Sequence, residues 1–372
     1  MTLTKYAVNF FSLRHFLCRV CEESKVRVMQ KLLSVAIPCY NSQDYVRKAI
    51  ESVLPGKDRV EIIVVDDGSK DDTAAIGDEY AAKYPGIVKV VRKENGGHGD
   101  AVMAGLAAAT GLYFRVLDSD DWLDEEALHK VLAVIDKMDQ ENDTVDLVIS
   151  NYVYEKVNEG RRKQINYRKT LPVDRKFTWE DVGKWATGSY ILMHSATYRT
   201  ELVRSCNMVL PKHTFYVDHL YVCHPMMKVQ SMYYIDVDLY RYFIGRADQS
   251  VNEKVMLSRM DQQVRVNRLL LTELDTDSLE NKKQRDYINY YVEIVTMATI
   301  TFYLRAGGKE NEKKMEDFMA EIKETKPAYF DLITSFPLKR HPLRALRYMP
   351  KWPIYPLYRF GYSIVRRVFD FN

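Results

Sequence analysis

Apolar and polar positions follow two different periods from residue 32 onward. Short, almost uninterrupted apolar runs have the length and β-branched content of buried strands, and they cover residues 33–37, 60–65, 87–91, 111–117 and 145–149. Segments with apolar residues at helical spacing lie between them, at 43–53, 71–84, 99–109 and 125–138. Strands that alternate with helices of this length predict an α/β fold with a mostly parallel sheet flanked by helices.

Clusters of polar and glycine residues fall at the carboxyl ends of four of these strands. They are Cys39-Tyr40-Asn41, Asp66-Asp67-Gly68-Ser69, Asn95-Gly96-Gly97-His98-Gly99 and Asp118-Ser119-Asp120-Asp121. Each cluster alone is also compatible with an ordinary turn that begins a helix. Because ligands bind open parallel sheets at the carboxyl ends of the strands, the four clusters together predict a ligand site.

The fourth cluster places three carboxylates next to one another. Like charges this close are tolerated in water, or beside a divalent cation that takes hard oxygen ligands. The two interpretations are therefore a metal site and a solvated turn that caps the helix beginning near Glu125. The chain has no Gly-x-x-x-x-Gly-Lys loop and no Gly-x-Gly-x-x-Gly after the first strand, which argues against P-loop enzymes and dinucleotide dehydrogenases. Carboxylates and backbone amides suit a nucleoside diphosphate held through a cation.

Composition narrows the class of protein further. A composition of 47% hydrophobic and 28% charged residues is typical of a folded protein. The length of 372 residues suffices for one large α/β domain with a smaller appendage, or for two ordinary domains. The net charge of +3 does not imply a nucleic-acid partner. Five cysteines predict a reducing compartment, and Cys18 and Cys21 lack the second pair that a zinc site needs. No run reaches the about 18 apolar residues of a membrane span, and residues 1–30 are predicted to be an extension without a signal peptide.

The motifs resemble those of the inverting glycosyltransferases of family 2, which have the GT-A fold. The resemblance covers about residues 32–250 and rests on Pro38-Cys39-Tyr40-Asn41, Val65-Asp66-Asp67-Gly68-Ser69, Asn95-x-Gly97 and Asp118-Ser119-Asp120-Asp121. It implies a metal-dependent enzyme that moves a sugar from a UDP-sugar to a hydroxyl of a glycan or lipid-linked acceptor, as in bacterial polysaccharide or cell-wall assembly. The expected organisation is an N-terminal extension at 1–30, a Rossmann-like GT-A domain at 31–250, a helical region at 251–335 and a tail at 336–372.

The resemblance also implies roles for individual residues. The nucleotide-sugar contacts would be Pro38, Tyr40, Asn41, Asp66, Asp67, Lys93, Asn95, Gly97 and Asp118. The Asp-x-Asp motif implies Mg²⁺ or Mn²⁺ at Asp118, with Asp120 and Asp121 as the candidates for a further ligand. Where the family often has Ala-Arg-Asn, this chain has Ala101-Val102-Met103, so His98 or Asp100 would have to substitute.

The second half of the chain contains the candidate for the catalytic general base. Phe215-Tyr216-Val217-Asp218-His219 is similar to the aromatic-Glu-Asp motif of the family, with Val217 in place of Glu. The resemblance makes Asp218 the general base that takes the proton of the acceptor hydroxyl; the alternative is an Asp that caps a helix at 220–229. Residues 241–251 resemble the flexible segment that closes over the nucleotide sugar, with Arg246 and Gln249 as diphosphate or acceptor contacts, or else as parts of a plain basic loop. Residues 150–180 are expected to be a polar excursion on the acceptor side.

Two other functions remain open at this point. A sugar-phosphate nucleotidyltransferase has a related sheet, but it needs a basic glycine-rich loop directly after the first strand. A non-catalytic nucleotide- or glycan-binding module would need no base, whereas Asp218 and the three central carboxylates are all retained.

The tail at 336–372 combines many basic and aromatic residues with little acid. On a helix, one face would hold Ile354, Leu357, Tyr358, Gly361, Ile364, Val365 and Val368, opposite Arg359, Arg366 and Arg367. This pattern favours an interfacial helix on an anionic membrane; the alternatives are packing on the helical region and binding to nucleic acid. We expect no nucleic-acid partner and a cytoplasmic protein held on the inner face of the cell membrane.

Deletion of residues 336–372 is expected to remove most of the binding to anionic vesicles, because each basic residue at such a surface contributes roughly 1 kcal/mol. Co-sedimentation with phosphatidylglycerol-containing vesicles measures the loss, and neutral phosphatidylcholine vesicles are the control. Unchanged sedimentation of the shortened chain would show that the tail is not the anchor.

Overall fold

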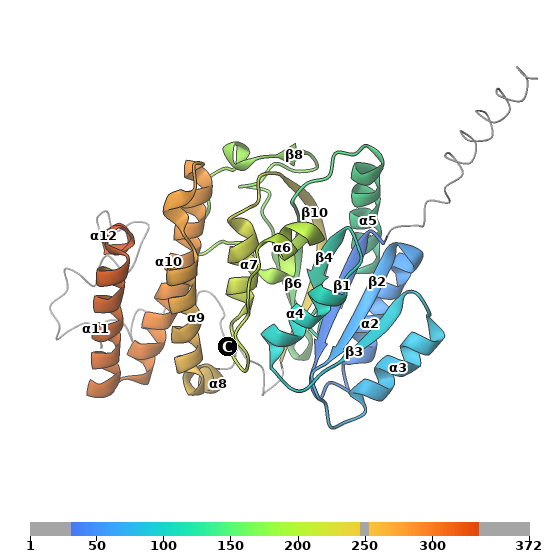
Figure 1. The fold of residues 1–372 in the computed structure, drawn as a ribbon, viewed down its shortest axis with the longest axis horizontal. Helices are drawn as coiled ribbons and strands as arrows, with labels where there is room; N and C mark the ends of the chain where they lie inside the picture. Colours follow the sequence, from blue (N-terminus) through green and yellow to red (C-terminus); the bar gives the residue numbers. More distant parts are fainter. Residues whose placement is uncertain (1–30, 246–252, 335–372) are drawn as a thin grey trace, which may run out of the picture.

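The computed structural model describes residues 31–245 and 253–334 (Figure 1). The expectations for residues 1–30, Arg246, Gln249 and the tail at 336–372 lie outside the described residues.

The described residues build a single mixed sheet between layers of helices. Its strands are β1 (Leu33–Cys39), β2 (Val60–Asp66), β3 (Val88–Arg92), β4 (Tyr113–Val116), β5 (Trp122–Leu123), β6 (Leu147–Lys156), β7 (Arg161–Ile165), β8 (Lys176–Phe177), β9 (Ala196–Arg199) and β10 (Met232–Ile244). Their order is β3-β2-β1-β4-β9-β6-β10-β5, with β7 paired to β6 and β8 to β10. Strands β3, β2, β1 and β4 are parallel, and β9 runs antiparallel between β4 and β6. The predicted α/β class is therefore confirmed.

Both faces of the sheet are covered, which explains the almost continuous apolar runs. In β1, Val35 and Ile37 belong to one hydrophobic cluster and Ala36 to the other. The first cluster is completed by α2 (Val46–Val53), α3 (Thr73–Lys83) and α5 (Glu125–Gln140). The second is completed by α4 (His98–Ala108), α6 (Thr200–Ser205) and α7 (Asp218–Met226).

Helix α4 lies unusually close to the sheet because it carries a glycine at the contact. A Cβ atom on Gly105 would lie 2.6 Å from the Cβ of Ala36 in β1. This contact brings the first turn of α4, which begins at His98, over the ends of the central strands.

The helical region after the sheet shares the second hydrophobic cluster. It consists of α8 (Glu253–Ser258), α9 (Met260–Glu273), α10 (Lys282–Ala306), α11 (Gly308–Thr325) and α12 (Pro327–Thr334). Figure 1 shows these helices side by side beyond α7, with α11 and α12 farthest from the parallel strands. Short 3-10 turns are Leu54–Arg59, Val157–Glu159, Trp179–Asp181, Met193–Ser195 and Thr276–Ser278. No helix among the described residues is long and apolar enough to cross a membrane.

Two expectations for the second half are corrected by the sheet. Residues 150–180 are only partly an excursion, since β6 continues to Lys156 and forms a hairpin with β7. The segment expected to be flexible from Arg241 onward is strand β10 as far as Ile244. Residues 241–244 pair with residues 153–156 of β6. In addition, Arg241 donates to Asp124 at 2.9 Å and to Glu155 at 3.0 Å.

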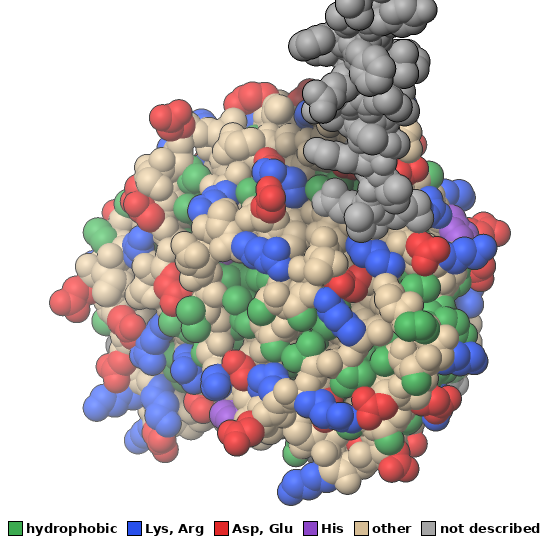
Figure 2. Space-filling model, turned by 45° about the vertical axis from the view of Figure 1, so that its right-hand side comes forward, with side chains coloured by type: hydrophobic (Ala, Val, Ile, Leu, Met, Phe, Trp, Pro, Cys, Tyr) green, Lys and Arg blue, Asp and Glu red, His purple; other side chains and the backbone are tan. Residues whose placement is uncertain are grey.

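Charged side chains are mixed on the surface. On the face in Figure 2, Lys and Arg are interspersed with Asp and Glu, and the described part of this face carries no block of a single sign.

Candidate functional site

The loops after β1, β2, β3 and β4 are hydrogen-bonded to one another at one edge of the sheet. The amide of Asp67 donates to the carbonyl of Cys39 at 2.9 Å, and the amide of Lys93 donates to the carbonyl of Asp66 at 3.1 Å. The hydroxyl oxygens of Ser42 and Ser119 lie 2.8 Å apart, which joins the loop after β1 to the Asp-x-Asp loop. The structure thus brings together the four clusters found in the sequence.

Asp67 organises the glycine-rich loop. Its carboxylate accepts from the amide of Gly96 at 2.9 Å, from the amide of Gly97 at 2.7 Å and from Nζ of Lys93 at 2.6 Å. The side-chain amide of Asn95 donates to the carbonyl of Asp67 at 2.9 Å. Asp67 is only 2% exposed, so in this structure its carboxylate binds the loop.

Gly97 is required where the loop turns into α4. Its φ is +85°, and an added Cβ would lie 3.0 Å from the backbone nitrogen of His213. The amide of His213 in turn donates to the carbonyl of Gly96 at 2.7 Å. The glycine loop therefore contacts the segment that precedes Asp218.

The loops after β1 and β2 form the neighbouring part of the edge. Asp66 is buried and accepts from the amide of Ser69 at 3.0 Å. Asn41, at a φ of 50°, accepts from the amide of Lys70 at 2.9 Å. Pro38 is buried inside β1, whereas the ring of Tyr40 is 50% exposed. Tyr40 is thus an aromatic surface at this edge that a planar ligand can reach.

Asp118 is paired with His98, the first residue of α4. Nε2 of His98 lies 2.9 Å from Oδ1 of Asp118. Burial alone would lower the pKa of His98, but the hydrogen bond to Asp118 and the nearby charges of Asp118 and Asp218 raise it overall. Burial would likewise raise the pKa of Asp118, but the hydrogen bond and charge of His98 lower it. Of the two suggested substitutes, His98 lies against the Asp-x-Asp motif, whereas Asp100 pairs with Lys93 at 2.6 Å.

Asp121 is bound to β10. Its Oδ2 accepts from the hydroxyl of Tyr240 at 2.6 Å and its Oδ1 from the amide of Phe243 at 2.8 Å. Burial, together with the charges of Asp120 and Asp118, raises the pKa of this fully buried carboxyl. Asp118 and Asp120 are partly exposed, so these two carboxylates are the accessible part of the motif.

Asp218 reaches the same site from the second half of the chain. It is the first residue of α7, and its charge contributes to the raised pKa values of His98 and Tyr190. Two residues just before it, His213 and Tyr216, have left-handed φ values of 48° and 66°. Such strain in non-glycine residues persists where the surroundings enforce it, and it is concentrated at functional sites.

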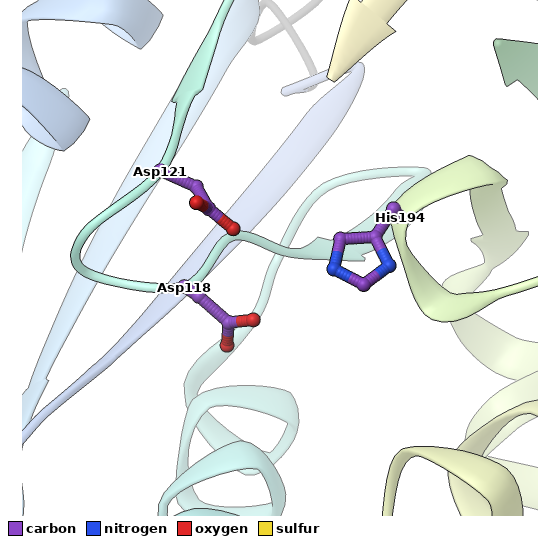
Figure 3. Close-up of side chains that lie close together, drawn as sticks. All are labelled: Asp118, Asp121 and His194. Carbon is purple, nitrogen blue, oxygen red and sulfur yellow. The ribbon is translucent and has the colours of Figure 1, made fainter. Parts of the chain in front are cut away.

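The structure adds one residue that the sequence did not single out. His194 lies in the turn Met193–Ser195, and one ring nitrogen and one oxygen each of Asp118 and Asp121 all lie within 4.8 Å of one another (Figure 3). Burial lowers the pKa of His194, which favours the neutral imidazole that binds metals. Nothing in Leu192-Met193-His194-Ser195 marks this histidine, because its partners lie more than seventy residues earlier.

Residues 34–201 match the family described as glycosyl transferase family 2. This segment belongs to that family. EpsH of Bacillus subtilis, named as a glycosyltransferase, is 34% identical over 153 residues, which are 41% of this chain and 40% of EpsH. GgaB of Bacillus subtilis, named as a minor teichoic acid biosynthesis protein, is 38% identical over 119 residues, 31% of this chain and 13% of GgaB. The chain spans less than half the length of these relatives.

The fold extends the likeness beyond the family segment. The crystal structure of residues 1–349 of S. aureus TarS in complex with UDP-GlcNAc superposes with a TM-score of 0.64 at 19% identity. The alignment covers 89% of this chain and 92% of that chain, so it includes much of the helical region. The expected GT-A fold with a C-terminal helical extension is thereby confirmed.

Asp67→Asn is expected to lower the free energy of unfolding by about 1–3 kcal/mol. The amides of Gly96 and Gly97 and the ammonium of Lys93 would lose their charged acceptor, and the new side-chain NH₂ group could face these donors. Asp44→Asn, at an exposed position, is the control. Urea denaturation monitored by circular dichroism measures both variants. Equal stability of the two would contradict the anchoring role of Asp67.

Proposed function

We propose that the chain is a metal-dependent inverting glycosyltransferase that moves a sugar from a UDP-sugar to a hydroxyl of a glycan or lipid-linked acceptor. The observation that carries the proposal is the convergence of Asp66 and Asp67, the Asp118-Ser119-Asp120 motif and Asp218 at one edge of a family 2 domain. The UDP-GlcNAc complex of TarS supports the donor class, and the name of GgaB supports a cell-wall polymer as the acceptor.

The donor would lie across the strand ends. The exposed ring of Tyr40 can stack on the base, and Asp66 can accept a hydrogen bond from the uracil imide. Pro38 and Asn41 would shape this part of the pocket, while Asp67 holds Lys93, Asn95 and Gly97 in place.

The donor atoms at the Asp-x-Asp motif fit a divalent cation. Asp118 and Asp120 offer carboxylate oxygens, which Mg²⁺ and Mn²⁺ prefer, and Asp121 supports the loop from behind. When bound there, the cation supplies charge neutralisation to the diphosphate leaving group. Asp118 would bind both this cation and the donor ribose.

Asp218 would carry the proton transfer. The acceptor hydroxyl oxygen forms a bond to the anomeric carbon while the bond from that carbon to the diphosphate oxygen breaks, and the electron pair of that bond leaves on UDP. The proton of the hydroxyl passes to the Asp218 carboxylate. Attack from the face opposite the leaving group inverts the anomeric configuration.

The acceptor would approach from the side of Asp218 and Tyr190. A lipid-linked acceptor would place the enzyme on the inner face of the cell membrane, and the tail at 336–372 would provide the contact. Arg246 and Gln249 would complete the diphosphate or acceptor contacts.

The binding test is calorimetry of UDP-sugars with and without Mn²⁺. We expect binding of at least one UDP-sugar that strengthens when Mn²⁺ is present, because the cation would offset repulsion between the diphosphate and the carboxylates. Each UDP-sugar is compared with the matching GDP-sugar. The absence of binding to every UDP-sugar would overturn the proposed donor class.

Asp218→Asn is expected to lower kcat by about 10²- to 10⁴-fold, because the amide cannot take the proton. Donor binding should stay unchanged, since the substitution is nearly isosteric. Asp317→Asn, exposed on α11, is the control. Near-full transfer by Asp218→Asn with normal donor binding would remove Asp218 from the role of base.

A further inference from the structure

The imidazole of His194 is buried without a hydrogen bond. Its exposed fraction is 8%, and among the described residues neither ring nitrogen has a hydrogen-bond partner. Buried polar side chains are satisfied in the large majority of cases, so such a group requires an explanation. A histidine with a purely structural role would normally donate one ring N–H to a neighbour.

The ring is held in place from several sides. It stacks on the ring of Tyr152, at a centroid distance of 5.4 Å, and on the ring of Tyr242, at 4.7 Å. The ring of Tyr240 meets it edge-on at 4.5 Å. These contacts fix the plane of the imidazole, although its nitrogens form no hydrogen bond within the described part of the chain.

The backbone of His194 is held as well. Its carbonyl accepts a hydrogen bond from Nη2 of Arg115, a fully buried residue of β4. Burial lowers the pKa of Arg115 to about 10, and within the described part of the chain its Nε and Nη1 have no hydrogen-bond partner. Arg115 stands three residues before Asp118, so one strand positions both the carboxylate and the turn that carries the imidazole.

The ring faces the carboxylates at near-ligand distance. One nitrogen of His194 and one oxygen each of Asp118 and Asp121 lie within 4.8 Å of one another, and Figure 3 shows the imidazole opposite both side chains. Ligand atoms about 2.0–2.2 Å from one cation lie at most about 4.4 Å apart. A contraction of less than about 1 Å would therefore let one cation contact His194 and Asp118.

We propose that His194 is a nitrogen ligand of the cation at Asp118 and that it biases the site toward Mn²⁺ over Mg²⁺. The inference rests on the proposed metal dependence. Imidazole suits transition-metal ions, whereas Mg²⁺ takes oxygen ligands almost exclusively. A site with two carboxylates and one imidazole thus favours Mn²⁺ over Mg²⁺ through the type of its ligands.

Electron paramagnetic resonance of bound Mn²⁺ tests the ligand directly, with the full chain and UDP present. In the natural protein we expect ¹⁴N modulation of the electron spin echo from one imidazole. His194→Gln should lose this modulation and weaken Mn²⁺ binding about tenfold or more, with Mg²⁺ binding changed less than about threefold.

Two matched variants separate the alternatives. His98→Gln removes the other imidazole next to Asp118 and should keep the ¹⁴N modulation. His129→Gln, at a partly exposed position on α5, should change neither the modulation nor the affinity. If His194→Gln does not fold, labelling of His98→Gln with ¹⁵N-histidine should convert the ¹⁴N signal to a ¹⁵N signal.

The outcomes distinguish the two proposals. If the natural protein with UDP binds no Mn²⁺, the proposed metal dependence fails. If it binds Mn²⁺ without nitrogen modulation, or if the modulation survives His194→Gln, the metal dependence stands and the assignment of His194 is wrong.

Discussion

The buried carboxylate of Asp121 connects the two halves of the molecule. It accepts hydrogen bonds from the hydroxyl of Tyr240 and the amide of Phe243, both in the last strand of the sheet. The Asp-x-Asp loop follows β4 in the first half, so this carboxylate fastens the site to a strand more than a hundred residues later in the chain. Its pKa is raised because the carboxyl is buried and lies near the charges of Asp120 and Asp118, all of which disfavour its ionised form.

A buried carboxylate also holds the glycine loop. Asp67 replaces water around the amides of Gly96 and Gly97 with a fixed negative charge, and Lys93 balances that charge. Buried charges are tolerated when they are paired and hydrogen-bonded in this way. Asp67 and Asp121 thus both support the scaffold of the site. In the Asp-x-Asp motif, the neighbouring Asp118 and Asp120 remain partly exposed.

The sequence was sufficient for the elements whose signals are local. Apolar runs located the parallel strands, and polar clusters directly after them located the site edge, because parallel strands place their carboxyl ends together. The end of β10 was missed, since it is a strand through its pairing with residues 153–156 of β6, which lie more than eighty residues earlier in the chain. His194 was missed for the same reason: its environment is made by Tyr152, Tyr240 and Tyr242, which only the folded sheet brings around it.

The contact between the glycine loop and the segment before Asp218 has a mechanical consequence. The carbonyl of Gly96 accepts from the amide of His213, and Gly97 lies against the same backbone. Residues 213–217, two of which have left-handed φ values, connect this contact directly to Asp218. A ligand that orders the glycine loop would therefore also constrain the segment that leads to Asp218. In the proposed mechanism, binding of the donor would then also position the base.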